Sequence, residues 1–384
     1  MKLEVFEKNT RTRVDIIRSY NYVYYEDEFS DRGKFEIRIP VHDHSLMWLY
    51  QLGNWILFDD GVLGIIKGVR DYEDSDTEIT IYGYLSNHIL EFRSFLLTSI
   101  YYDTPPQIAL SMFDELFVNP DDERRKIGFL EASEDVPEWS GKIRYQSTGK
   151  TFLETLRTMF SPYDLGVELY PVVKNYDEQT GQYANIDSFE FRIIKPVYRT
   201  VNNTDGNTPV VFSFDNNNLQ NLEYEEDGQD FASVAIVASE GTGQQRLTTE
   251  VDNTSIEYTG YERIELYVDA RDLQSDEESE DPITDEELLE MMVERGKEKL
   301  QDHMIFISFN ASIIEGKYKY GVDFNKGDYV SVVDKNTNRI YDVQIVAYRK
   351  TYSEGVEHND LTIGIDRMKV HKLRQERLLS LIYT

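Results

Sequence analysis

The sequence has no cysteine, and this absence sets the first limits on the protein. Without thiolates there is no disulfide framework, no cysteine-ligated zinc and no cysteine nucleophile. The sequence also has no apolar run near the roughly 20 residues that a membrane-spanning helix needs, so we expect no membrane anchor. The N-terminus, Met1 to Lys8, carries Glu4 inside its apolar stretch, which predicts a strand rather than a signal peptide.

Positive charge is scarce, because 40 Lys and Arg stand against 71 Asp and Glu, for a net charge of −31. An acidic surface repels phosphate and releases few counterions from DNA, so ordinary nucleic-acid binding is disfavoured. This charge is typical of a channel lining that DNA passes without binding, and it equally fits a surface charge that only keeps the protein in solution. Tyrosine is frequent, with 27 copies, which fits either protein interfaces or the strands of β-barrels.

Complete nucleotide-binding motifs are also missing. Thr148-Gly-Lys-Thr151 resembles the end of a phosphate-binding P-loop, but Arg144 stands where the motif needs its first glycine. Gly241-Thr-Gly243 begins like a dinucleotide fingerprint, but Arg246 replaces the third glycine and no helix is expected after it. We therefore predict no cofactor.

No catalytic residue can be named from the sequence. His42 and His44 offer two points of a metal site, but no third ligand of suitable spacing accompanies them, so we predict no metal. Six scattered histidines and the lack of a Gly-x-Ser-x-Gly elbow argue against a serine hydrolase. Among 71 acidic residues, nothing singles out a carboxylate pair for glycoside cleavage. The sequence predicts a protein that is not an enzyme.

What the sequence does contain is one hairpin plan written twice, at residues 53–83 and 327–364. Each copy has a Gly-led strand, an Asp/Gly/Asn turn, a second strand ending in basic residues, a polar loop and a short strand closing on Gly. Runs of this kind are typical of antiparallel hairpins. Their repetition favours two similar β-barrels over a catalytic cleft, although any two hairpins share some of these features.

The chain is long enough for two to four domains. We predict an α+β, mainly β protein with two similar small β-barrels, an α+β insert domain and a helical insertion in the second barrel. The expected limits are 1–97 for the first β-barrel, 98–200 for the α+β insert, 201–268 and 304–368 for the second β-barrel, 269–303 for the acidic helical insertion and 369–384 for a C-terminal tail or helix.

Three helices are predicted from start signals followed by apolar stripes. Thr104-Pro105 provides an N-cap and a first position, and Ser147 or Thr148 is expected to open a second helix. Thr284-Asp-Glu-Glu287 has the form of a capping box, which predicts a helix near 284–302. The expected stripes are Ala109, Met112, Phe113, Leu116 and Phe117; Phe152, Leu153, Leu156, Met159 and Phe160; and Leu289, Met292, Val293, Gly296 and Leu300.

The C-terminal stretch is basic and then apolar. Its apolar residues are Leu378, Leu379, Leu381 and Ile382. Exposed apolar helices usually mark interfaces, so we expect these four residues to contact another chain. Packing back onto the chain's own second barrel is the alternative.

Several segments resemble phage tail-tip hub proteins, which include the central baseplate hub of contractile phages and the N-terminal hub of tail-associated lysozyme (Tal-like) proteins. Ser30 to Pro40 looks like their early hairpin, and Gly327-Asp328 matches the start of the second-barrel hairpin. Phe231 to Arg246 is similar to a segment of the Gram-positive siphophage branch. The resemblance covers the whole chain in domain order, and its motifs are structural rather than catalytic.

This resemblance implies a structural protein of the virion tail tip, made in the cytoplasm of a host bacterium. It implies a homotrimer that stacks on the hexameric distal tail ring, meets the tape-measure protein and the tail-tip or receptor-binding components, and encloses a channel that DNA passes without specific binding. Three chains with two similar barrels each would present six near-equivalent surfaces to a sixfold tube. Salt should promote the trimer by screening the net charge.

Two other functions remain open at this level. One is a cell-wall hydrolase that uses Asp and Glu chemistry, since members of the resembled family often carry a C-terminal peptidase or muramidase. The chain stops soon after the second barrel, so we do not expect that activity here. The other is a carbohydrate-binding module for host attachment, which would expose tryptophan platforms; the only candidates are Trp48, Trp55 and Trp139.

Overall fold

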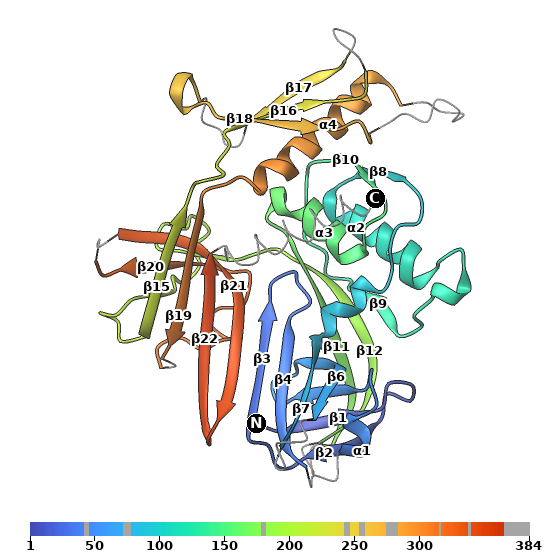
Figure 1. Ribbon diagram of the computed structural model, residues 1–384, viewed down its shortest axis with the longest axis vertical. Helices are drawn as coiled ribbons and strands as arrows, with labels where there is room; N and C mark the ends of the chain where they lie inside the picture. The colour runs from blue at the N-terminus through green and yellow to red at the C-terminus, as the bar shows by residue number, and fades with distance from the viewer. Residues whose placement is uncertain are drawn as a thin grey trace.

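The computed structural model describes residues 1–41, 46–71, 78–177, 182–241, 246–252, 258–273, 283–314, 316–336 and 339–364. Within these residues the protein is mainly β, with one 14-stranded sheet and three small sheets that pack with short helices (Figure 1). The predicted α+β, mainly β class is therefore correct. No described helix has the length and apolar character needed to cross a membrane.

The first half of the large sheet is built from the N-terminal strands. Their order in the sheet is β3-β4-β7-β6-β5-β1-β2. Buried and partly exposed side chains alternate along β7, as expected for a strand with one face on a core. The bounds are β1 Leu3–Phe6, β2 Arg13–Ile17, β3 Tyr22–Glu28, β4 Lys34–Pro40, β5 Trp55–Phe58, β6 Leu63–Asp71 and β7 Glu78–Leu85, with a short helix α1 at Leu46–Leu49.

The second half repeats this order with strands from the C-terminal part of the chain. They follow one another as β15-β19-β22-β21-β20, and two short strands, β13 and β14, lie parallel to β20. The bounds are β13 Tyr198–Arg199, β14 Val211–Phe212, β15 Leu219–Asp227, β19 Phe306–Ile313, β20 Tyr329–Asp334, β21 Arg339–Ser353 and β22 Val356–Gly364.

The two halves also share their hydrogen-bond register. The Gly53 N–H donates to the Ile66 carbonyl at 2.8 Å, and the Gly327 N–H donates to the Ile345 carbonyl at 2.7 Å. Both glycines have a positive φ, of 90° and 91°. In each half a register shift follows the isoleucine. The residues that pair in turn across four strands are Tyr25, Phe35, Gly83 and Ile66 in one half and Tyr224, Phe309, Ile363 and Ile345 in the other.

This correspondence confirms the duplicated hairpins that the sequence predicted, but two closed barrels are not found. Among the described strands neither half closes by hydrogen bonds. Instead, β3 pairs antiparallel with β21, from Tyr22 opposite Ser353 to Glu28 opposite Ala347, and this contact joins the halves into one sheet. The edge of β3 used between the halves is therefore not available to close the first half, and in the second half β15 has no strand on its outer edge among the described residues.

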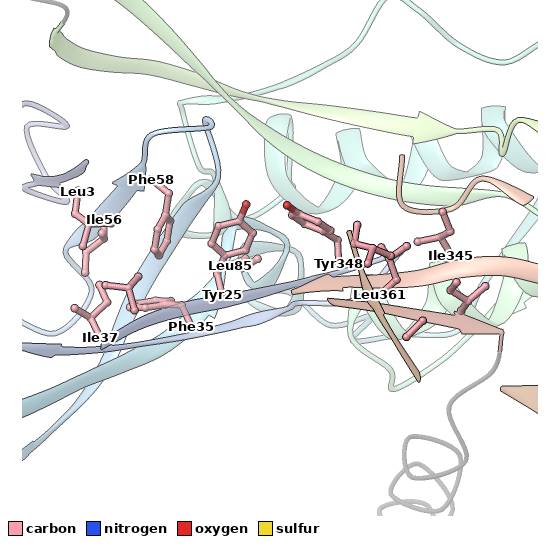
Figure 2. Close-up of a cluster of buried hydrophobic side chains, with 14 of the residues drawn as sticks. Leu3, Tyr25, Phe35, Ile37, Ile56, Phe58, Leu85, Ile345, Tyr348 and Leu361 are labelled. Atoms are coloured by element: carbon pink, nitrogen blue, oxygen red, sulfur yellow. The ribbon is translucent and has the colours of Figure 1, made fainter. Parts of the chain in front are cut away.

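A single apolar core runs under the junction between the halves. Tyr25 of β3 and Tyr348 of β21 face each other there, with ring centroids 6.4 Å apart (Figure 2). The core continues to Leu3 in one direction and to Leu361 in the other (Figure 2). Burial of this apolar surface stabilises the halves as one body.

The segment after β7 forms the α+β part of the fold around a second core. Thr104 caps the first helix as predicted, because its side chain accepts a hydrogen bond from the Gln107 N–H. The second helix begins later than predicted: Ser147 ends a strand, and Thr151 is the N-cap that accepts from the Glu154 N–H. The bounds are η1 Ser86–Glu91, β8 Ser99–Asp103, α2 Pro105–Phe113, η2 Asp114–Val118, η3 Glu123–Arg125, β9 Leu130–Ala132, β10 Ile143–Ser147, α3 Phe152–Phe160, η4 Ser161–Tyr163, β11 Gly166–Asp177 and β12 Gln182–Ile194.

A third unit stacks one helix on three strands. The predicted capping box is present at Thr284, whose side chain accepts from the Glu287 N–H while Glu287 accepts from the Thr284 N–H. We expected the strands of this unit in the second barrel, but they pair with each other around β16 in a separate sheet. The bounds are β16 Val234–Ala238, β17 Thr248–Asp252, η6 Gly260–Glu262, β18 Glu265–Asp269 and α4 Asp285–Gln301.

Candidate assembly surfaces

The segment that resembled a P-loop is a helix cap in the structure. Thr151 caps α3, and the Thr148 hydroxyl donates to the Thr98 hydroxyl at 2.9 Å. Gly241 has φ of +134°, in a loop whose next four residues lie outside the described part of the chain. His42 and His44 also lie outside it, as do Leu378, Leu379, Leu381 and Ile382. The described residues hold no group of three or more His, Asp or Glu side chains arranged for a metal ion.

A cavity of about 170 Å³ lies where the α+β part meets α4, and charged side chains line it. Glu298 is buried in its wall, and burial raises the pKa of this carboxyl. Arg144 of β10 pairs with Glu287 of α4 at 2.6 Å, and Arg295 pairs with Asp272 at 2.9 Å. These ion pairs tie α4 to β10 and to the loop that carries Asp272, so the cavity lies within a charged contact between units.

Lys326 is buried where the two halves and the α+β part meet. Its ammonium forms an ion pair with Asp27 of β3 and another, at 2.9 Å, with Glu168 of β11. Burial alone would lower the pKa of Lys326, but these two carboxylates raise it above its ordinary value. One cation therefore holds three segments together. The sequence analysis missed this residue, and its only signal was a lysine beside the repeated Gly327.

The junction of the halves is held by charge as well as by backbone hydrogen bonds. Arg349 of β21 donates from Nε to Glu26 of β3 at 2.7 Å, and Lys34 of β4 approaches the same carboxylate at 3.3 Å. Burial alone would raise the pKa of Glu26, but a hydrogen bond with Glu28 and the charges of Arg349 and Lys34 lower it to about 2. The sequence showed that both hairpins end in basic residues; the structure shows what the second one binds.

Two strand edges have no strand beside them in the described part of the chain. β15 pairs with β19 alone, and its exposed residues include Glu223 and Glu225. β6 pairs with β5 only from Leu63 to Ile65, so its last residues, with the exposed Arg70, have β7 as their one strand partner. Unpaired backbone groups at an exposed edge are a template for another strand. These two edges are the candidate assembly surfaces of the protein.

Comparison with solved structures shows that two prophage tail proteins share this fold. Prophage tail protein gp18 from Listeria monocytogenes EGD-e is similar over 100% of both chains, with 14% identity and a TM-score of 0.54. The 43 kDa tail protein of prophage MuSo2 from Shewanella oneidensis is similar over 94% of this chain and 98% of its own, with 11% identity and a TM-score of 0.55. A search of curated proteins by sequence finds no match. The family model described as Siphovirus ReqiPepy6 Gp37-like protein matches residues 2–365, and the chain belongs to this family.

Proposed function

We propose that the protein is a structural component of a phage or prophage tail tip, where three copies form a baseplate hub. The observation that carries this proposal is the duplicated half-sheet: two sets of five strands with the same order and register in one chain. The likeness in fold to prophage tail proteins, together with the family, supports a place in the tail.

The duplication explains how a trimer fits a sixfold tube. Each chain carries two near-equivalent half-sheets, so three chains present six of them around one axis. Cyclic assembly needs only one kind of contact repeated head to tail. We therefore propose a trimeric ring that joins the hexameric distal tail ring to the tip below and encloses the DNA channel.

The charge of the chain fits a channel that DNA passes. A net charge of −31 per copy repels the phosphate backbone, which lowers non-specific binding to DNA during passage. The same charge opposes self-association, and screening over roughly 8 Å at physiological salt reduces this repulsion. The protein is accordingly expected to trimerise more readily as the salt concentration rises.

Further proposals concern the remaining contacts. We propose contacts with the tape-measure protein and with tail-tip or receptor-binding components, and a role for Leu378, Leu379, Leu381 and Ile382 in binding another chain. Of the domain limits expected from the sequence, we retain 1–97, 98–200 and 369–384 as part of this proposal, whereas the strands between Val234 and Asp269 join α4 in a separate unit. We place the protein in the virion after its synthesis in the host cytoplasm.

A carbohydrate-binding module is the less favoured function. Such a site presents a flat, exposed aromatic ring. Trp55 is buried at 4% exposure, and Trp48 and Trp139 are half-buried. The ring of Trp139 packs edge-on against Tyr163, with centroids 5.8 Å apart. None of the three tryptophans forms an open platform.

The proposed function is tested in the virion. A phage or induced prophage that carries an epitope tag at a described surface loop of this protein, such as the one with the exposed Gly260, is imaged after labelling with antibody. Label at the tail tip alone supports the proposal, and label on the head or absence from the particle contradicts it. A zymogram on host cell wall serves the alternative: clearing by the purified chain would establish a hydrolase.

A further inference from the structure

The junction between the two halves uses one surface from each half. The first half contributes the outer edge of β3. The second half contributes the C-terminal part of β21, which changes partner along its length: Arg339 to Gln344 pairs with β20, and Ala347 to Ser353 pairs with β3. Because the halves are equivalent strand by strand, each half also carries the surface that the other half uses.

The unused surfaces are the two unpaired edges described above. β15 corresponds to β3, since Tyr224 pairs with Phe309 as Tyr25 pairs with Phe35. β6 corresponds to β21, and its pairing with β5 ends at Ile65 just as the pairing of β21 with β20 ends at Gln344. In the described structure, neither β15 nor the end of β6 has a strand on this edge.

The unused surfaces repeat the acidic end of β3 and the arginine of β21, although Asp71 of β6 stands where β21 has Lys350. β3 ends in Glu26-Asp27-Glu28, and β15 ends in Glu225-Glu226-Asp227. Counting from the equivalent isoleucines across the shared register shift, Arg70 of β6 takes the position of Arg349 of β21. Counting from the equivalent tyrosines, Glu225 takes the position of Glu26. Both residues of the junction's ion pair, Arg349 and Glu26, therefore have equivalents of the same type in the other half, Arg70 and Glu225.

We propose that the outer edge of β15 adds as an antiparallel strand to the end of β6 in a second copy of this chain. The register follows from the junction: Arg70 lies opposite Glu225, Val69 opposite Glu226 and Gly68 opposite Asp227. This inference rests on the proposed ring, for which it supplies the interface.

A second copy is the occupant that the structure favours. Within one chain, six other strands separate β15 from β6 in the sheet, and the two lie in different parts of the molecule, β15 at the left and β6 in the lower part (Figure 1). The acidic end of β15 suits the basic residues Lys67 and Arg70 of β6, and the pairing would repeat the register of the β3–β21 contact. The contact joins different surfaces of the two copies, so it repeats head to tail, and a threefold rotation would close it into the proposed ring.

Engineered cysteines test the register directly, because the native chain has none. Full-length Arg70→Cys and Glu225→Cys chains are mixed at high salt and oxidised, and the products are separated by mass. We expect disulfide-linked dimers that contain one chain of each kind. A mixture of Arg70→Cys with Gln220→Cys is the matched control, because Gln220 is five residues further along the same exposed strand and should give little linkage.

Other linkage patterns would overturn the inference. Dimers formed by Glu225→Cys alone would show a twofold pairing of two β15 edges. A yield of linked dimer as high with Gln220→Cys as with Glu225→Cys would show that the two strands meet without a fixed register. If the mixed pair gives no linkage although the mass in solution is that of a trimer, the ring stands but is closed by another surface. Label at the tail tip in the virion would leave the proposed function intact in each of these cases.

Charge reversal provides an independent test. Arg70→Glu and Glu225→Arg should each weaken trimer formation by about tenfold or more, since each places like charges opposite one another. The double variant should recover most of the loss. Circular dichroism checks that each variant folds. Arg124→Glu is the matched control, because its pair with Asp122 lies exposed on the α+β part, and it should leave association unchanged. Equal association of the folded single variants and the unchanged chain would contradict the proposal.

Discussion

Arg349 of β21 binds Glu26 of β3 across the one strand pair that joins the two halves of the large sheet, with Nε 2.7 Å from the carboxylate. The carboxylate is almost fully buried, while the guanidinium is half-exposed. The two residues lie 323 positions apart in the sequence. A long-range contact between two charged residues therefore adds to the backbone pairing of β3 with β21 over the apolar core.

Replacing Arg349 by Ala should destabilise the fold by about 1–3 kcal/mol, because a buried carboxylate loses a charged hydrogen bond. Lys34 remains near Glu26 and limits the loss. Urea denaturation of the purified chain measures the change. Arg124→Ala, which removes an exposed ion pair, should cost less than about 1 kcal/mol. Equal losses in the two variants would show that the junction does not depend on this pair.

Glu26 should make stability depend on pH in the acid range. Its pKa is about 2 in the folded chain against an ordinary value of 4.5, so the unfolded chain binds the proton more tightly. The stabilisation is therefore present above pH 4.5 and is lost as the pH falls towards 2. Urea midpoints between pH 7 and pH 3 should fall less steeply for Glu26→Gln than for the unchanged chain. Glu134→Gln, at an exposed site, should keep the original slope.

Lys326→Met should destabilise the protein by about 3–5 kcal/mol, because it leaves the carboxylates of Asp27 and Glu168 close together without their shared cation. Thermal or urea unfolding monitored by circular dichroism measures this loss. Lys335→Met removes an exposed lysine from the β20–β21 turn and should change stability by less than about 0.5 kcal/mol. A small effect at Lys326 would mean that the three segments are held without it.

The equivalent glycines Gly53 and Gly327 should respond differently to alanine. Both have a φ near 90°, so either substitution strains the backbone by about 1–2 kcal/mol. A Cβ at Gly327 would also lie 2.5 Å from the ring of Phe29, whereas a Cβ at Gly53 meets the flexible Lys8 side chain at 3.1 Å. Gly327→Ala should therefore cost at least about 1 kcal/mol more than Gly53→Ala. Urea denaturation compares them, and the reverse order would contradict the packing described here.

Local signals in the sequence predicted the local structure well. The Gly-led strands at Gly53 and Gly327 predicted the repeated hairpins, and Thr284 with Glu287 predicted the start of α4. These succeed because turns and caps depend on residues that are close in the chain. The one error in a cap, Thr151 rather than Ser147 or Thr148, arose because Ser147 is taken up by a strand pair with β8.

Long-range pairing could not be predicted in the same way. The repeated hairpins predicted that each half closes into a barrel. In the structure, the outer edge of β3 pairs with β21 instead, with Arg349 opposite Glu26. Similarly, nothing near β16 indicates that it pairs with β17 and β18 rather than with the large sheet. Strand patterns specify which face is buried, and they do not specify the partner strand.

The assembly surfaces were visible in part. The sequence showed basic residues at the ends of both hairpins, including Arg70 and Arg349, without a reason for them. In the structure Arg349 binds Glu26, and the proposal that Arg70 binds Glu225 of a second copy depends on the register that places Glu225 where Glu26 lies. The apolar residues from Leu378 to Ile382, which the sequence favoured as an interface, lie outside the described structure and remain a prediction.

The most direct test of the account is a cryo-electron microscopy map of the tail tip that contains this protein. We predict three copies around the tail axis, with six near-equivalent half-sheets in a ring and β15 of each copy beside β6 of the next. Six copies in the ring, a single copy on the axis, or three copies that meet through other surfaces would contradict the account.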